Sequence, residues 1–396
     1  MLKPNTRALS ANLRQMMKIT SSKLAVPVAA LLGLFATTPG YSLVTFNDGQ
    51  NSIFVNVSTG MSWDSNINSS ADTTSDHIWF ANVGVNFSRR AGIISIDANA
   101  TANISRFNNH SEENFANPDM SLSLSKHTGR TTGTLSLSGA RQNRADSAAN
   151  IRNESWYYNA QGSLKYPIIS RYSLTFGGGF HERTFRNAPG YLVDDRVTNW
   201  STGLNYAYTD QTDLTASYRG RYGETSAHDS YYDHAFLVGV NGKILAKLTG
   251  SFHMGYQQRN NTKKWQGSHS SLTMSGSANW RISPKFNAAF FISKDFSVAS
   301  TNIHTDTLSA GTNVSYSLTP RFSVNGGING GESRFLGLGG GGRKDQFFGA
   351  NVGASYAVYG DYLRLHLGYN YFRNWSNTAI SDYDRDSLSL SASSRF

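Results

Sequence analysis

The chain has 396 residues, of which 36 are Lys or Arg and 26 are Asp or Glu, giving a formal net charge of +10. It contains no cysteine, which excludes disulfides and thiolate metal sites. The body of the chain shows no run of basic residues and no recognition motif, so its charge does not indicate a nucleic-acid partner.

Residues 1–42 predict a secretory signal peptide. They carry five basic residues and no acidic one, followed by an apolar run from Leu24 to Ala36 that is too short to cross a bilayer. Small residues such as Gly40 and Ser42 stand where a signal peptidase cleaves. The remaining residues hold 31 basic and 26 acidic side chains, a mild net charge of +5. We therefore expect an exported protein in which residues 43–396 form one domain.

Polar and apolar residues alternate along the rest of the chain, as they do in strands whose two faces meet different surroundings. One segment places apolar side chains on one parity and polar ones on the other: Leu248, Phe252, Met254 and Tyr256 against Thr249, Ser251, His253 and Gln257. The last segment does the same, with Leu388, Leu390, Ala392 and Phe396 against Ser387, Ser389, Ser391 and Ser393, Ser394 being an exception. No segment approaches the roughly 20 apolar residues of a transmembrane helix.

The alternating runs number about eighteen and often persist for about ten to fifteen residues, which is long enough for a tilted strand to cross a bilayer. Strands of soluble sandwiches are usually about five or six residues long. The runs are centred near Val57, Val83, Ala98, Leu122, Leu137, Ala160, Phe176, Leu204, Ala216, Val238, Phe252, Met274, Phe290, Gly311, Gly326, Val352, Leu367 and Leu390. The pattern predicts an all-β, transmembrane antiparallel β-barrel of about 18 strands with a water-filled lumen.

Aromatic residues and connection lengths support the same topology. Aromatic side chains gather at strand ends, where a bilayer places two girdles: Trp63, Trp79, Trp156, Tyr166, Trp200, Tyr208, Tyr218, Trp280, Tyr316, Tyr356, Tyr371 and Trp375. Short turns, such as 90–92, 128–130, 167–170, 209–212, 241–243, 283–284, 319–320 and 359–361, alternate with longer polar loops, among them 65–75, 108–118, 146–152, 187–194, 333–344 and 374–382. An even barrel of this kind has both termini in the periplasm and its long loops outside the cell.

The polar parity predicts which side chains line the lumen. We expect nine candidates there: Lys165, Arg183, Arg219, Arg221, Lys247, Arg259, Arg281, Arg364 and His366. With few inward acids, such as Asp97 and Asp295, the lining is expected to be net basic and to favour anionic solutes. The alternative is that these cations pair with loop acids and aromatic rings and only stiffen the wall. The sequence leaves both open, because a register error of one residue exchanges the two faces.

Two local motifs resemble known outer-membrane barrels. The terminal Phe396 after the alternating last strand resembles the closing strand that the barrel-assembly machinery recognises. The run from Gly60 to Ile67 resembles the opening stretch of the putative β-barrel porin 2 family, which includes barrels encoded with exopolysaccharide biosynthesis systems. This resemblance implies a channel of the Gram-negative outer membrane that exports a secreted polysaccharide, with a periplasmic polysaccharide-export protein as partner and outer-membrane lipid around it.

Two other kinds of channel or barrel stay open at this level: a general or anion-favouring diffusion porin, and a surface receptor or adhesin whose loops do the work. No motif fixes a nucleophile with a histidine, so no enzyme is expected. Asp382, Asp384 and Asp386 are interpreted as a hydrated strand rim rather than a calcium site. The run 339–342 lacks the Lys-Ser/Thr of a phosphate loop, and no metal or cofactor is expected.

Overall fold

The computed structural model describes residues 44–46, 50–90, 92–186, 189–263, 267–337, 342–359 and 362–396. The predicted signal peptide, residues 1–42, lies outside the described residues and stays a prediction. The same holds for parts of the predicted connections, namely Ala91, residues 187–188, residues 338–341, Gly360 and Asp361.

Nearly all of the described chain is β-strand. The strands are β1 (Val44–Phe46), β2 (Asn51–Asp64), β3 (Asp76–Arg89), β4 (Ser95–Phe107), β5 (Phe115–Lys126), β6 (Thr132–Asp146), β7 (Ile151–Ile169), β8 (Tyr172–Arg186), β9 (Asp195–Thr209) and β10 (Thr212–Thr225). They continue as β11 (Ser230–Leu245), β12 (Leu248–Asn261), β13 (Ser268–Arg281), β14 (Phe286–Val298), β15 (His304–Ser317), β16 (Phe322–Phe335), β17 (Lys344–Tyr359), β18 (Leu363–Ser376) and β19 (Tyr383–Arg395). Two short 3₁₀ turns, Ser111–Glu113 and Ala379–Ser381, lie in loops. No helix among the described residues is long and apolar enough to span a membrane.

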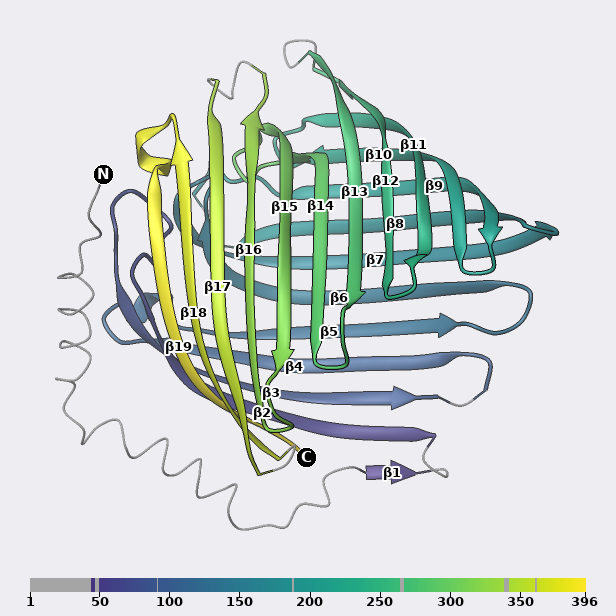
Figure 1. Cartoon of the computed structure of the whole chain (residues 1–396). Helices are drawn as coiled ribbons and strands as arrows, with labels where there is room; N and C mark the ends of the chain where they lie inside the picture. The colour runs from purple at the N-terminus through teal and green to yellow at the C-terminus, as the bar shows by residue number, and fades with distance from the viewer. Residues whose placement is uncertain are drawn as a thin grey trace, which may run out of the picture. The chain divides into compact units, whose positions relative to one another are not determined.

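Strands β2 to β19 form a closed antiparallel barrel in which each strand pairs with its neighbours in sequence. The ring closes between β19 and β2, where Leu390 faces Met61, and Phe396 exchanges two backbone hydrogen bonds of 2.8 Å with Val55. Closure pairs the edge groups that would otherwise each cost several kcal/mol in lipid. In Figure 1 the strands β13 to β19 cross β2 to β9 behind them, as expected when tilted strands occupy opposite walls of one barrel. The predicted eighteen-strand barrel is therefore confirmed, and β1 only adds a short pairing to β2.

The strand register carries one parity around the whole ring. Leu390 faces Leu367 on β18 and Met61 on β2, whereas Ser391 faces His366 and Gly60. Apolar side chains of the first parity are strongly exposed, with Phe236 at 67% and Val238 at 61%. In water such a surface would be unstable, but in lipid it is the expected outer skin of a barrel.

The aromatic residues predicted to form girdles all lie on the outward parity. Some of them stack on outward neighbours: the rings of Trp156 and Tyr158 lie 5.9 Å apart and parallel, on one strand. Tyr316 packs against the ring of Phe286 on β14 at 6.1 Å. Trp200 lies over Gly220 on β10, where a Cβ atom would come within 2.2 Å of the indole. Glycine at this position leaves the space that the indole occupies.

Several strands extend further than the sequence pattern indicates. Pro118 and Pro167, expected in a loop and a turn, lie within β5 and β7. The predicted turn at Asn241–Lys243 is wrong: β11 runs on to Leu245 through Gly242, whose φ of +120° suits glycine. The actual turn is at residues 246–247, and the pairing of β11 with β12 has a register irregularity between Lys243 and Leu245. Turn-forming residues therefore marked a bulged strand end here.

Candidate functional site

Contacts between strands that are not neighbours show which parity faces the interior. Arg219 on β10 contacts Asp295 on β14 at 3.0 Å, although β11, β12 and β13 lie between them in the wall. Such a contact is possible only through the lumen. Residues that are direct partners on neighbouring strands share a face of the sheet. The inward residues of every other strand therefore follow from Arg219 through the pairing register.

Most of the inward face consists of Ser, Thr, Asn and Gly. On the wall formed by β2 to β4, the Asn86 carboxamide accepts hydrogen bonds from Asn56 at 3.2 Å and from Asn99 at 2.9 Å. Asn82 donates to Ser58 at 3.0 Å. On the far side of the closure, His366 lies between the hydroxyls of Ser355 and Ser393, at 2.8 and 3.0 Å. This lining offers donors and acceptors without a fixed charge.

The structure places the nine lumen-lining candidates as follows. On strands with inward parity lie Lys165 (β7), Arg183 (β8), Arg219 and Arg221 (β10), Arg259 (β12), Arg281 (β13), Arg364 and His366 (β18). Lys247 is different: it lies in the turn after β11, and its ammonium donates to the carbonyl of Ile282 at 2.8 Å. The parity rule fails for Lys247 because a turn has no pleat.

Inward cations have carboxylate partners to a degree that the sequence did not show. Lys165 pairs with Asp213 at 2.5 Å across two intervening strands, and Arg183 pairs with Asp195 at 3.0 Å. Asp233 pairs with Arg259 as well. The expectation of few inward acids is therefore wrong, because Asp195, Asp213 and Asp233 were not recognised. The parity of β9 and β10 would have identified Asp195 and Asp213 as inward. The inward face of β11 also carries the apolar or aromatic residues Leu237, Ala235 and Tyr231, so the alternation along β11 does not show which face Asp233 is on.

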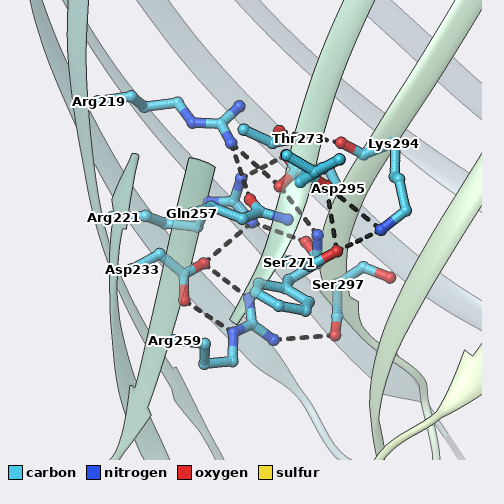
Figure 2. A network of polar contacts seen from close by, with 12 residues as sticks. Arg219, Arg221, Asp233, Gln257, Arg259, Ser271, Thr273, Lys294, Asp295 and Ser297 are labelled. Atoms are coloured by element: carbon cyan, nitrogen blue, oxygen red, sulfur yellow. Dashed lines mark hydrogen bonds and ion pairs between the residues drawn. The ribbon is translucent and has the colours of Figure 1, made fainter. Parts of the chain in front are cut away.

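The end of the β14–β15 hairpin leaves the wall and folds toward the lumen. Pairing of β13 with β14 stops at Met274 and Lys294, so β14 beyond Lys294 stays paired with β15 but is no longer paired with β13. There Asp295 meets Arg219 and Arg221 of β10, at 3.0 and 2.5 Å, as Figure 2 shows. We call residues 295–304 the inward tip.

Arg259 anchors the inward tip to β11 and β12. Its side chain is fully buried and donates twice to the Asp233 carboxylate, at 2.8 Å for each hydrogen bond. It also donates to the carbonyl of Ser297 at 3.0 Å and lies 2.9 Å from Nδ1 of His304 (Figure 2 shows the contacts to Asp233 and Ser297). The guanidinium lies over the ring of Tyr231, 3.8 Å from its centroid. Charge, hydrogen bonds and ring contact thus hold the tip against β11 and β12.

Loops at the long-loop end also reach across the barrel. Arg343, before β17, donates to the carbonyls of Ser147 and Ala148 after β6, at 2.8 and 3.1 Å. These strands lie far apart in the ring, so the contact crosses the mouth. Asn150 donates to the Ser69 carbonyl at 2.9 Å and accepts from the Ser381 hydroxyl at 2.6 Å, which ties the β2–β3 and β18–β19 loops together.

The acids interpreted as a strand rim have protein partners. Arg373 contacts Asp382 and lies 3.9 Å from Asp384, and the Tyr369 hydroxyl donates to Asp386 at 2.5 Å. Among the described residues, no group of three or more metal-ligating side chains could hold a metal ion.

A closed antiparallel barrel with an exposed apolar outer face and an inner face of Ser, Thr, Asn and Gly defines this chain as a porin-like β-barrel. Residues 224–396 match the model of the family described as putative β-barrel porin 2, which confirms the predicted resemblance over β11 to β19 and the end of β10. The motif-like stretch Gly60–Ile67 lies outside the matched range. No curated protein matches the chain.

Solved barrels of similar fold include Pseudomonas aeruginosa OpdK with vanillate, at 13% identity and a TM-score of 0.47, covering 87% of this chain and 99% of that one. Pseudomonas aeruginosa OccK2 (OpdF) has 9% identity and a TM-score of 0.49, covering 89% and 100%. Acinetobacter baumannii OccAB3 has 10% identity and a TM-score of 0.46, covering 87% and 99%.

Proposed function

We propose that this protein is a channel of the outer membrane through which saccharides pass, with a secreted polysaccharide as its substrate. The observation that carries the proposal is the lining, whose hydroxyl and amide groups can exchange hydrogen bonds with sugar hydroxyls as a chain slides past. The resemblance to barrels encoded with exopolysaccharide systems supports the outward direction of transport.

The ion pairs inside the barrel favour substrates of low charge. Lys165, Arg183, Arg219, Arg221 and Arg259 each lie against a carboxylate, so their fields are largely offset at the distance of a passing solute. A strong preference for anions needs cations whose charge is not offset in this way.

The short-turn end holds the β1–β2 pairing and Phe396, close to the closing strands. We propose that this end faces the periplasm, where a polysaccharide-export protein would deliver the polymer. Phe396 would be recognised by the barrel-assembly machinery, and outer-membrane lipid would surround the exposed apolar parity.

A general diffusion porin is the second candidate, and the same uncharged polar lining supports it. Two measurements separate the possibilities. Conductance in planar bilayers comes first, because a receptor or adhesin with a closed lumen passes little current. Deletion of the gene, with and without a plasmid copy, then tests export: we expect secreted polysaccharide to fall and to recover with the plasmid. Unchanged secretion in a conducting barrel would leave the diffusion porin in its place.

A further inference from the structure

A pocket of about 310 Å³ lies on the inner wall near the long-loop end. Its wall side comes from inward residues of β18 and β19, namely Asn370, Phe372, Tyr383, Arg385 and Ser387. Ser69, Ala145 and Ser147, from the β2–β3 loop and the end of β6, form the other side. The volume lies at the lower end of the range of roughly 300–1,000 Å³ that is usual for small-molecule sites.

The floor of the pocket is aromatic, in contrast with the hydroxyl-rich wall around it. The ring of Phe372 stacks on that of Phe347 at 6.4 Å and 20°, and packs against Tyr383 at 5.9 Å. Tyr383 is only 4% exposed, so it holds Phe372 in place from behind. These rings point inward, away from the outer skin, and membrane anchoring therefore does not explain them.

The polar side of the pocket is built around Arg385. Its guanidinium binds both carboxylate oxygens of the buried Asp64, at 2.5 to 3.1 Å, and donates to the Ser69 hydroxyl at 3.3 Å. Asp64 offsets the positive charge, while a guanidinium has five N–H donors, more than these contacts occupy. Asn370 and Ser387, which share a hydrogen bond of 3.3 Å, add amide and hydroxyl groups at the edge.

We propose that this pocket binds one neutral pyranose ring of a saccharide inside the channel. The C–H face of the sugar packs on Phe372, and its equatorial hydroxyls reach the donors and acceptors of Arg385, Asn370 and Ser387. The paired charge of Arg385 and Asp64 favours a neutral ring over a uronate. This inference rests on the proposed saccharide channel and adds a binding site to it.

The test uses the full barrel in planar bilayers, with maltohexaose, mannohexaose and chitohexaose added at the long-loop side. We expect at least one of these neutral oligosaccharides to block the current in resolved events. Phe372→Ala should shorten the blocks by about fivefold or more, because it removes the ring face. Phe372→Leu keeps apolar packing without the ring and should have a similar effect, which guards against a folding defect in the alanine variant.

The matched controls are Phe54→Ala and Phe54→Leu, which change an inward ring of β2 that packs against Arg395 near the short-turn end. They should leave the block durations unchanged. Equal effects of both sets, or no effect of the Phe372 variants, would overturn the site, as would the absence of block by all three sugars in a conducting barrel. A wild-type barrel that passes no current would instead contradict the proposed channel itself.

Discussion

Replacing Arg259 with methionine should release the inward tip and destabilise the barrel. The guanidinium is fully buried, and its loss leaves the buried Asp233 with only Arg221, at 3.3 Å, as a cationic partner. Removing one member of a buried ion pair typically costs 3–5 kcal/mol, and because Arg221 remains we expect about 3 kcal/mol. The hydrogen bond to Ser297 and the contact with His304 are lost as well, so the tip loses its anchor to β12.

The assay is urea unfolding of the reconstituted barrel in lipid vesicles, followed by far-ultraviolet circular dichroism. Arg281→Met is the matched control. Arg281 is an exposed inward arginine at the last position of the neighbouring strand β13, whose first residues lie beside Arg259. The free energy of unfolding of this variant should differ from the wild type by less than about 0.5 kcal/mol. Single-channel recording of Arg259→Met should show a larger or noisier open conductance. A stability loss below about 1 kcal/mol with unchanged conductance would refute the anchoring role of Arg259.

Three further predictions follow from the lining, the outer skin and the closing strand. Wild-type channels in a KCl gradient should show a reversal potential near zero. Asp213→Asn should shift the reversal potential toward anion selectivity, because Lys165, 2.5 Å away, loses its carboxylate partner. Strong anion selectivity of the wild-type channel would contradict the pairing of the inward charges. Leu390→Arg should cost about 2–4 kcal/mol of unfolding free energy in lipid, whereas Ser389→Arg, one residue away on the inward parity, should cost much less, and equal costs would mean that the faces are misassigned. Deleting Phe396 removes two backbone hydrogen bonds of the closing strand and should lower the fraction of heat-modifiable, folded barrel in membranes, a fraction that should stay unchanged if the residue plays no part in closure or assembly.

The arrangement of strands was largely predictable from sequence. Strand alternation depends only on the pleat, so Leu390 and Ser391 reveal opposite faces without any knowledge of their neighbours. All eighteen predicted centres lie in β2 to β19, and the loop predicted at Ser65–Ser75 matches the gap between β2 and β3. Errors concentrated where one residue pattern fits two local structures. Gly242 suits both a turn and a bulged strand, and Lys247 shares the parity of β12 but lies in the turn just before that strand.

The partners of the inward charges were not predictable in the same way. Arg219 and Asp295 are 76 residues apart in sequence and separated by three strands in the wall. Their contact requires barrel closure and the inward bend of β14 after Lys294, and neither leaves a periodic signal. The pocket formed by Phe372, Arg385 and Ser69 likewise joins segments from opposite ends of the chain.

By itself, the sequence determined that one face of each strand meets lipid and the other meets water. The reason is that this alternation of apolar and polar side chains is present residue by residue along the strands. Only the tertiary structure decided that five of the predicted inward cations lie against carboxylates and that the end of the β14–β15 hairpin contacts β10 and β12. Those features depend on the strand register and on the curvature of the closed barrel, which no single strand reveals.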